Sequence, residues 1–527
     1  MIIRSAHPAP VIPRGPLQDL VLGRVRDLPD KLALVDVRSG KQFTYAELRA
    51  AIHRVAGSLA ARGLVKGDIF AIACANCAEF ILAFHAVGLL GGTVTTLNPA
   101  YTTDEMANQL KDSGATWLLT DAAILPKALE AAAAVGIRRI FTTGGSDAFP
   151  PAAAEGFETL DAGDHAVPSV EMDPATHLMA LPYSSGTIGL PKGVMLTHGN
   201  LSVNVLQSVV CGLEENDVIL GVLPLFHIFG MNVMMNTGFA MGGTLVLLPR
   251  FDLEEFLGAV QRYRATYVFL VPPVLLALAK HPLVDKFDLS SLRCLLSGAA
   301  PLGEAVARQV EERIGCLVMQ GYGLTETSPV ALVSALDGSM PRASAGVPVA
   351  GTEARIVHLE TGDPVEEGER GELWIRGPQV MKGYLNRPDA TAEAIDAEGW
   401  FRTGDIARVD AEGHIYVVDR LKELIKVKGM QVAPAELEAL LLSHPSVADA
   451  AVIPIHDDKS GERPKAFIVL KPGEPQDADA LMAFVSERVA PHKRVTEVEF
   501  TAQIPKSPSG KILRRILVEQ EREKRDK

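Results

Sequence analysis

The chain has 527 residues, a net charge of −13 and 47% hydrophobic residues. That length is too great for one simple core, so two or more domains are expected. The negative charge, without a broad basic stripe, argues against a general nucleic-acid binder. No basic-then-apolar leader pattern and no run of eighteen apolar residues occurs, which predicts a cytoplasmic protein without a membrane span.

Strand-like apolar runs alternate with amphipathic helical stretches through most of the chain. Strand patterns cover 68–73, 116–120 and 244–248, and helical patterns cover 47–62 and 255–264. This alternation predicts α/β layering with largely parallel sheets. The apolar stretch from Phe80 to Leu90 is interrupted by His85 and is interpreted as a buried helix.

Beyond residue 352 the pattern changes to short strands separated by turns, at 354–357 and 371–377, which predicts a small β-rich subdomain. A charged junction follows, and then about a hundred residues with an α+β pattern. The predicted architecture is a large N-terminal domain (1–418) of layered α/β subdomains plus that β-rich subdomain. A hinge (419–422) and a small mobile α+β C-terminal domain (423–527) complete it.

Five cysteines in a chain of this length suggest a reducing compartment. Cys74 and Cys77 have the spacing of a redox pair. They lack the second pair that a zinc site needs, and no thioredoxin-like context surrounds them. The favoured interpretation is two small buried thiols.

The segment 183–193 places hydroxyls, glycines and one lysine directly after an apolar run. Small residues let backbone N–H groups approach an anion, and Lys192 adds positive charge, as binding of a polyphosphate requires. It is not a Walker A loop, because Gly193 follows the lysine. A mobile turn is the alternative interpretation.

His227 lies among aromatic residues, where it could steer a carboxylate substrate or close a pocket. A satisfied core histidine is the alternative. In the segment 320–327, Tyr322 offers a flat face for a base, Thr325 a phosphate donor and Glu326 a hard oxygen ligand for Mg²⁺. A glycine-rich loop with a helix-capping Thr-Glu pair would also explain that segment.

Three further segments carry candidate groups. Asp405 is predicted at the end of a tight turn, where a carboxylate can bind both hydroxyls of a ribose. The basic cluster at 422–431 could be a solvated surface or could bind phosphates between two domains. The loop 505–515 presents Lys511 at its tip, which is either simply exposed or delivers a charge into a closing site.

Together these segments resemble the adenylate-forming superfamily, which includes acyl-CoA synthetases, firefly luciferase and the adenylation domains of peptide synthetases. The chain looks most like the 4-coumarate:CoA ligase group, and 418–438 is very close to that group's pattern. The match runs in order from Phe43 to Arg515. The resemblance implies an AMP-forming acid–thiol ligase that uses ATP, Mg²⁺ and coenzyme A on a small carboxylic acid. A monomer or homodimer is expected.

The resemblance also implies roles for individual residues. The phosphates would be held by Ser184, Ser185, Gly186, Thr187, Ile188, Gly189 and Lys192. The AMP site would be formed by Gln320, Gly321, Tyr322, Thr325, Asp405, Arg420 and Lys422, with Glu326 on Mg²⁺. The catalytic residues would be Lys511, Lys426, His227 and Glu326. The acyl pocket would be formed by Ile228, Phe229, Val233, Ala299, Gly323, Pro329 and Val330.

In such enzymes the small domain rotates about a hinge, here Lys422. Lys511 serves acyl-adenylate formation and is then withdrawn. The rotation brings Lys426 to the site for thioester formation, with Lys428, Gly429 and Arg250 placed for coenzyme A.

Two departures from the family pattern are expected to matter. Ile188 replaces a threonine, so one hydroxyl donor is missing, and restoring threonine should raise activity. Phe229 and Val233 stand where plant coumarate ligases have a tyrosine and a serine near the 4-hydroxyl. An apolar pocket prefers an acid lacking that hydroxyl, so cinnamate or a medium-chain fatty acid should serve at least as well as 4-coumarate.

Three alternatives to an aryl-CoA ligase are kept open. One is a medium- or long-chain fatty acyl-CoA synthetase. Another is an acyl-AMP ligase that loads a carrier protein. The third, from another class, is a non-catalytic nucleotide-binding protein. Glu326, Asp405, Lys426 and Lys511 argue against the third, since a protein without turnover has no need for both lysines.

Overall fold

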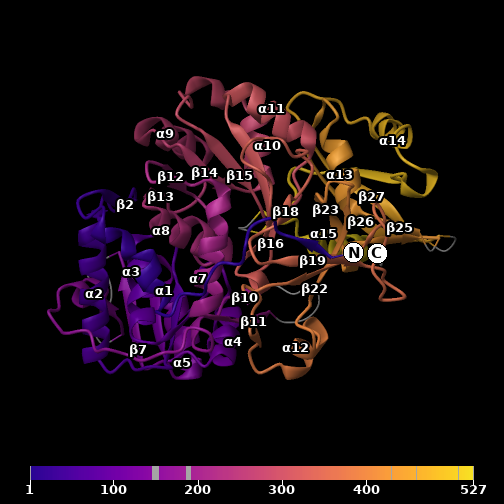
Figure 1. Cartoon of the computed structure of the whole chain (residues 1–527). Coiled ribbons are helices and arrows are strands. Elements are labelled where there is room, and N and C mark those ends of the chain that lie inside the picture. Colours follow the sequence, from indigo (N-terminus) through magenta and orange to yellow (C-terminus); the bar gives the residue numbers. More distant parts are fainter. Residues whose placement is uncertain are drawn as a thin grey trace.

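The computed structural model describes residues 2–144, 153–184, 191–428, 430–457, 460–507 and 510–525. Figure 1 shows the indigo helices α1, α2 and α3 on one side of the molecule and the yellow C-terminal elements on the other, with the N and C labels drawn close together in this view. The strands of the described residues form two nine-stranded sheets and two five-stranded sheets. The predicted α/β architecture, with a large N-terminal and a small C-terminal part, is confirmed.

The first sheet is parallel at its centre, where β4, β5, β6 and β7 pair in the same direction. Its strands, in spatial order, are β10 (Tyr183–Ser184), β11 (Lys192–Thr197), β9 (Leu178–Ala180), β5 (Thr93–Thr96), β4 (Ile69–Ala73), β6 (Trp117–Asp121), β7 (Arg139–Thr143) and β8 (Glu155–Gly156), with β21 (Gly383–Tyr384) beside β11.

The second sheet is also parallel through its middle strands. Its strands, in spatial order, are β18 (Val347–Pro348), β17 (Val330–Val333), β16 (Leu317–Gly323), β15 (Cys294–Ser297), β14 (Tyr267–Leu270), β12 (Val218–Gly221), β13 (Thr244–Leu247), β2 (Leu32–Asp36) and β3 (Gln42–Thr44).

The helices of this region are α1 (Leu17–Val21), α2 (Tyr45–Ala61), α3 (Ala78–Leu89), α4 (Thr103–Ser113), α5 (Leu125–Val135), α6 (Glu158–Asp161), α7 (His198–Gln207), α8 (Gly238–Met241), α9 (Leu253–Tyr263), α10 (Pro272–Lys280) and α11 (Glu304–Ile314), with a π-helix at Phe229–Thr237.

The two faces of β4 show why these residues form layers. Successive side chains of a strand point to opposite faces. Phe70 and Ile72 belong to the core that includes α2 and α3 and continues into the second sheet. Ala71 and Ala73 belong to a separate core with α4 and α5. The first sheet is therefore covered on both faces, as its continuous apolar strands predict.

The β-rich part is an antiparallel sheet of β1 (Ile3–Arg4), β19 (Glu353–Val357), β20 (Gly371–Arg376), β22 (Phe401–Val409) and β23 (Ile415–Arg420), with α12 (Pro388–Ala394) nearby. The C-terminal part contains β24 (Ile425–Val427), β25 (Met430–Val432), β26 (Val447–Asp457), β27 (Gly461–Leu470), β28 (Glu497–Phe500), α13 (Pro434–Leu442), α14 (Ala478–Ser486) and α15 (Arg514–Arg525). One of its hydrophobic cores draws solely on residues from Ile425 to Phe500.

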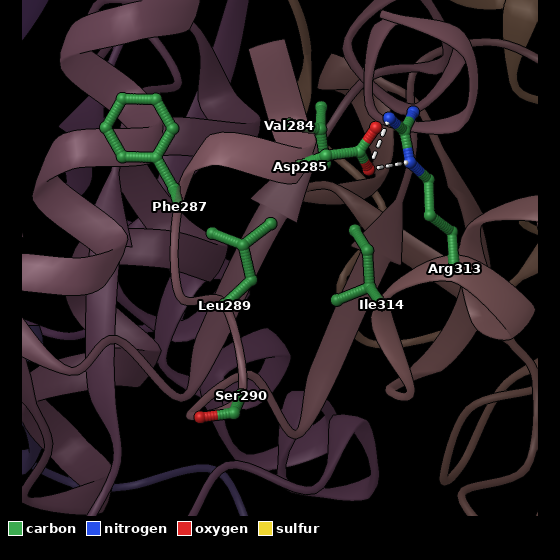
Figure 2. Close-up of a pocket in the computed structure, with 7 residues that line it drawn as sticks. All are labelled: Val284, Asp285, Phe287, Leu289, Ser290, Arg313 and Ile314. Carbon is green, nitrogen blue, oxygen red and sulfur yellow. Dashed lines mark hydrogen bonds and ion pairs between the residues drawn. The ribbon is translucent and has the colours of Figure 1, made fainter. Parts of the chain in front are cut away.

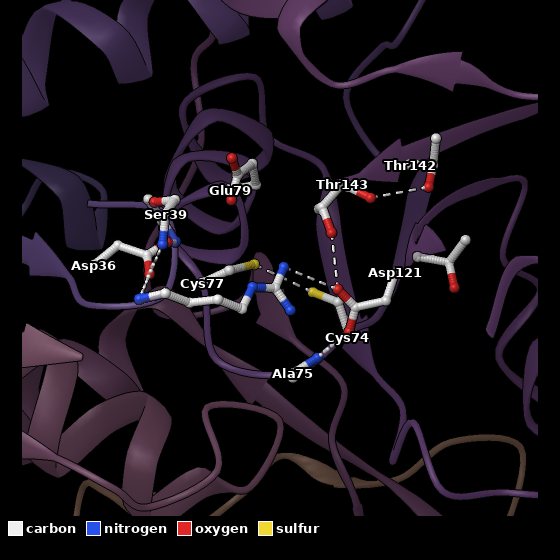
Figure 3. A network of polar contacts seen from close by, with 12 residues as sticks. Asp36, Ser39, Cys74, Ala75, Cys77, Glu79, Asp121, Thr142 and Thr143 are labelled. Atoms are coloured by element: carbon white, nitrogen blue, oxygen red, sulfur yellow. Dashed lines mark hydrogen bonds and ion pairs between the residues drawn. The ribbon is translucent and has the colours of Figure 1, made fainter. Parts of the chain in front are cut away.

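The loop between β4 and α3 contains the two closely spaced cysteines (Figure 3). The Cys74 and Cys77 sulfur atoms lie 3.8 Å apart, and both thiols are free and buried. Asp121 accepts hydrogen bonds from the Ala75 backbone N–H at 2.7 Å and the Thr143 hydroxyl at 2.8 Å. The interpretation of both residues as buried thiols is confirmed, within a polar network that fixes this loop.

Most predicted elements of the large domain are found within two or three residues of their expected bounds, including the helix predicted near Phe80 to Leu90. None of the described helices combines the length and apolar character needed to cross a lipid bilayer.

Candidate active site

Candidate groups from four segments gather at one place between the large and small domains. His227 follows β12, Glu326 follows β16, and Asp405 lies on β22. Lys511 comes from the loop before α15. Its charge acts on His227, and Asp405 and Glu326 act on the Lys511 ammonium. The structure therefore brings these four predicted residues together.

The loop that carries Lys511 is a small hairpin closed by its own hydrogen bonds. Ser507 N–H donates to the Lys511 carbonyl at 2.8 Å, and Lys511 N–H donates to the Ser507 hydroxyl at 3.1 Å. Gly510 has a φ of +77°, and a Cβ there would lie 2.9 Å from the Val271 side chain of the large domain. This glycine lets the hairpin tip pack against the large domain.

The electrostatic surroundings of Lys511 are mixed. Burial, followed by the positive charge of Arg420, lowers the pKa of Lys511. Asp405 and Glu326 oppose this shift. An ammonium group in such surroundings gains when further negative charge arrives, so this place suits an anionic substrate.

Asp405 does not lie at the end of a tight turn, and that prediction was wrong. It lies within the nine-residue strand β22 and pairs with Arg420 on β23. The register between β22 and its neighbour β20 shifts between Glu372 and Trp374 of β20. Gly404, in the same stretch of β22, has a φ of +71°. A bulge of this kind commonly re-aims a side chain beside an active site.

The carboxylate of Asp405 is held from two sides. The Tyr322 hydroxyl donates to it at 2.6 Å, and the Arg420 guanidinium lies 3.5 Å away. Burial raises the pKa of Asp405, and Arg420 opposes that shift. These contacts fix the carboxylate where it could accept hydrogen bonds from a diol.

Glu326 lies in a short 3₁₀ turn, Thr325–Thr327, and is 7% exposed. The Tyr384 hydroxyl donates to its Oε1 atom at 2.9 Å. Among the described residues, no basic side chain forms an ion pair with it within 4.0 Å. A buried carboxylate without a cationic partner there is a fitting oxygen ligand for a divalent cation such as Mg²⁺.

The loop that carries His227 is held by Asn76, a residue that the sequence did not single out. The Asn76 amide donates to the carbonyls of Leu223 at 2.9 Å and Leu248 at 3.1 Å. Its oxygen accepts from Leu225 N–H at 2.8 Å. Asn76 thus ties the loop after β4 to two loops of the second sheet.

Burial, and secondly the Lys511 charge, lowers the pKa of His227 to about 3. The ring is therefore neutral at pH 7 and can accept or donate one hydrogen bond without adding charge.

The predicted acyl pocket begins with the π-helix Phe229–Thr237, an uncommon element that occurs frequently at functional sites. The Phe229 ring packs edge-to-face on Phe269, with centroids 5.9 Å apart. A Cβ at Gly298 would lie 2.8 Å from the Phe229 ring, so this ring occupies the space beside that glycine. Val233 is fully buried.

The remaining predicted pocket residues differ in how far their side chains are exposed to solvent. Ile228, Pro329 and Val330 are buried and Ala299 is partly buried. Gly323 is explained by packing: a Cβ there would lie 1.9 Å from the Pro329 carbonyl oxygen. The glycine therefore permits close approach of two backbone segments.

Among the nucleotide residues, Gln320 has a structural role that sequence reasoning missed. Its side chain accepts from Leu302 N–H at 2.9 Å and donates to the Leu302 carbonyl at 3.1 Å. Gly321, Tyr322 and Thr325 follow it and are partly buried. Gln320 thus anchors the start of the nucleotide segment.

The predicted phosphate loop is described only at its ends. Ser184 and Lys192 are antiparallel partners on β10 and β11. Ser185, Gly186, Thr187, Ile188 and Gly189 lie outside the described residues, as does Gly429. The Lys192 ammonium lies 4.8 Å from the centre of the Tyr384 ring.

The predicted second-step residue Lys426 and the predicted coenzyme A residues Lys428 and Arg250 are exposed, as is the predicted hinge residue Lys422. Arg250 follows β13, a parallel neighbour of the strand that precedes His227. Lys426 lies on β24, and its backbone N–H donates to Glu462 at 2.7 Å.

A cavity of about 180 Å³ lies elsewhere, against α11 (Figure 2). It is lined by Val284, Asp285, Phe287, Leu289, Ser290, Arg313 and Ile314. The Arg313 guanidinium is already bound to Asp285 at 2.7 Å and to the carbonyls of Leu278 and His281, both at 3.0 Å. None of the candidate catalytic residues lines it.

Comparisons with known proteins identify the family. Residues 23–385 match the AMP-binding enzyme family, and residues 436–511 match the AMP-binding enzyme C-terminal domain. The chain is 42% identical to 4-coumarate--CoA ligase 3 of Arabidopsis thaliana, over 98% of this chain and 93% of that protein. It is 41% identical to 4-coumarate--CoA ligase 5 of Oryza sativa subsp. japonica, over 98% and 96%.

Solved structures show the same likeness. The crystal structure of ATP-bound MatB from Rhodopseudomonas palustris has a TM-score of 0.86 and 29% identity, covering 96% of this chain and 99% of that one. Both family domains occur in order, and the likeness extends over nearly the whole length. The chain therefore belongs to the AMP-binding enzyme family, as an AMP-forming acid–thiol ligase.

Proposed function

We propose that the enzyme joins a cinnamate-type aryl acid to coenzyme A through an acyl-adenylate. A carboxylate oxygen attacks the α-phosphorus of ATP and pyrophosphate leaves. The coenzyme A sulfur then attacks the acyl carbon, losing its proton, and AMP leaves. The observation that carries the proposal is the occurrence of both AMP-binding domains in a chain 41–42% identical to 4-coumarate--CoA ligases over 98% of its length. The carboxylate of Asp405, held by Tyr322 at 2.6 Å and Arg420 at 3.5 Å, supports it.

Each of the candidate residues has a part that its surroundings support. Lys511 would bridge the acid and the α-phosphate, where positive charge stabilises the transition state. Asp405 would hold the ribose hydroxyls. His227, neutral at pH 7, would border the acid without repelling or trapping it. Glu326 would hold Mg²⁺, which offsets the negative charge of the triphosphate.

The acyl pocket supports an acid without a 4-hydroxyl group. Phe229 and Val233 present hydrocarbon surfaces, and Phe229 fills the space beside Gly298. Hydrophobic walls leave a phenol hydroxyl without a partner, although they reject it only weakly. We therefore place cinnamate at or above 4-coumarate in kcat/KM.

Domain movement, oligomeric state and compartment are part of the same proposal. The hinge is placed at 419–422, between a large domain of 1–418 and a C-terminal domain of 423–527. The C-terminal core of residues Ile425 to Phe500 supports that division. We propose a cytoplasmic monomer or homodimer, and the five free, buried cysteines agree with a reducing compartment.

The test is formation of AMP and acyl-CoA from ATP, coenzyme A and five acids: 4-coumarate, cinnamate, benzoate, octanoate and palmitate. We expect thioester formation with cinnamate, at a kcat/KM at least equal to that with 4-coumarate. The double variant Phe229→Tyr, Val233→Ser should shift preference towards 4-coumarate. Formation of acyl-adenylate without thioester would indicate a carrier-protein acceptor. If none of the five acids gave an acyl-adenylate, the proposal would be contradicted.

A further inference from the structure

Tyr384 lies where the two predicted anion-handling segments meet. Its strand, β21, pairs antiparallel with β11, so that Tyr384 is opposite Val194. Leu385 N–H donates to the Gly193 carbonyl at 2.8 Å, and Met381 N–H donates to the Glu326 carbonyl at 2.8 Å. The segment 381–385 is thus fastened at one end to the Glu326 turn and at the other to the strand that begins with Lys192.

The Tyr384 side chain touches a functional group on each side. Its hydroxyl donates to Glu326 Oε1 at 2.9 Å. Its ring lies 4.8 Å from the Lys192 ammonium, within the range of a cation–π contact. The residue is 9% exposed, so both contacts are made with little competition from water.

We propose that Tyr384 is a positioning residue that sets both the Mg²⁺ ligand and the phosphate lysine. Its hydroxyl holds one carboxylate oxygen of Glu326 and leaves the other directed to the metal. Its ring supports the Lys192 ammonium beside the triphosphate. This inference rests on the proposed function, because it assigns Glu326 to Mg²⁺ and Lys192 to phosphate.

The expected effect of losing the Tyr384 hydroxyl can be estimated from similar hydrogen bonds in other metal sites. Carboxylates that bind metals are themselves held by hydrogen bonds, and losing one typically costs about 10–100-fold in metal affinity or activity. The ring contact is worth less, roughly 0.5–1 kcal/mol at an exposed site and more when desolvated, which is about a two- to fivefold effect on nucleotide affinity.

The two contacts can be separated by two substitutions. Tyr384→Phe removes the hydroxyl and keeps the ring, whereas Tyr384→Leu removes both. Tyr416, on β23, provides a matched control, because its hydroxyl donates to the carboxylate of Asp410 at 3.0 Å and not to Glu326. Tyr416→Phe therefore deletes a tyrosine–carboxylate bond of the same kind elsewhere.

The experiment is calorimetric titration of the full-length protein with α,β-methylene-ATP, with excess Mg²⁺ and with EDTA. The ratio of the two dissociation constants measures the Mg²⁺-dependent part of binding. Tyr384→Phe should reduce that ratio about tenfold and leave the affinity in EDTA unchanged. Tyr384→Leu should also weaken binding in EDTA, by about two- to fivefold. Tyr416→Phe should change neither quantity.

The outcomes separate this inference from the proposed function. If wild-type protein binds the analogue more tightly with Mg²⁺ and Tyr384→Phe keeps the full ratio, the inference is wrong and the function stands. Equal weakening of Tyr384→Phe in both media would mean a merely structural role and would also overturn it. Wild-type protein that does not bind the analogue, or binds it without help from Mg²⁺, would overturn both.

Discussion

Two lysines of the C-terminal domain meet the rest of the molecule in opposite ways. Lys511 lies on a hairpin whose tip packs against Val271, and its charge reaches Asp405, Glu326 and His227. Lys426 lies on β24 and is exposed. The C-terminal domain thus presents Lys511 to the site and Lys426 to solvent. If Lys426 serves the second half-reaction, as we propose, that domain has to rotate between the two steps.

Contacts between the domains hold this orientation. The Lys280 ammonium, at the end of α10, donates to the carbonyls of Leu442 at 2.9 Å and Val447 at 3.2 Å. Leu442 is the last residue of α13, where the carbonyl end of a helix favours a cation. Arg370 lies 3.5 Å from Glu436 on the same helix. These contacts are polar and partly exposed, so they can break and reform.

The largest expected effect comes from Lys511→Met, which keeps much of the side-chain length and removes the charge. Acyl-adenylate formation should fall by about 100–1,000-fold, the range seen when one charge-stabilising donor is lost. Thioester formation from supplied acyl-adenylate should change by less than about threefold. Single-turnover assays of each half-reaction measure both rates.

Lys506→Met is the control for this variant, since Lys506 belongs to the same loop and pairs with Asp449 at 2.6 Å. An equal loss of both half-reactions in Lys511→Met would show damage to the domain and remove the contrast between the two lysines.

Lys426→Met is expected to have the opposite effect on the two half-reactions, slowing thioester formation and sparing adenylate formation. Adenylate formation should stay within about threefold of wild type, because Lys426 is exposed in this orientation. Thioester formation from supplied acyl-adenylate should fall by about 100-fold, as for a misplaced reacting group. The same two single-turnover assays decide the matter, and a primary loss of adenylate formation would contradict the assignment.

A smaller effect is expected for Lys280→Met. The variant loses two charged hydrogen bonds across the domain interface, worth roughly 1 kcal/mol after allowance for partial exposure. Adenylate formation should slow by about fivefold and thioester formation should not slow. Lys66→Met is the matched control, because Lys66 donates to the Glu171 carbonyl at 2.6 Å within the large domain. Unchanged adenylation in Lys280→Met would show that this contact does not hold the orientation.

The smallest expected effect is on the titration of His227. Its pKa is lowered first by burial and then by Lys511, to about 3. Removing the Lys511 charge should raise the pKa of His227 by roughly half a unit, still below 6.5 because burial persists. Proton NMR of the histidine ring, assigned with His227→Asn, measures the shift.

The same titration affects stability. Between pH 6.5 and about 3 the unfolded chain binds a proton that folded His227 does not. The free energy of unfolding therefore falls as the pH is lowered through this range. Folded His227 is almost unprotonated above pH 5 in both proteins, so the free energy of unfolding of wild type and Lys511→Met should fall in parallel between pH 6.5 and 5. The two curves should separate only below about pH 4, where the variant loses less stability because its folded-state pKa is higher. Curves that stay parallel down to about pH 3 would mean that Lys511 does not act on His227.

Much of the fold could be predicted from local pattern, because the large domain consists of parallel strands with continuous apolar runs and amphipathic helices between them. The site residues were found through spacing and resemblance, since the nucleotide residues lie in segments rich in glycine and polar groups and His227 stands out among aromatic residues. Tyr384 and Asn76 could not be found in this way. Their partners, Glu326 and the backbone at Leu223 and Leu248, are far along the chain, and nothing local marks such contacts.

The error at Asp405 has a related cause. A glycine before an acidic residue is typical of a turn, but here the glycine accommodates a bulge within a long strand. The difference depends on which strand lies opposite, and single-chain patterns contain no information about that neighbour.

The packing of Phe229 on Gly298 has a consequence for how this enzyme could acquire other substrates. A side chain at position 298 would collide with the ring, so enlarging 298 is tolerable only after position 229 becomes smaller. The two positions should therefore be epistatic, with double substitutions departing from the sum of the single ones. Laboratory evolution that enlarges position 298 first would meet an intermediate with this collision, whereas a path that reduces position 229 first, or a library that varies both codons together, would not.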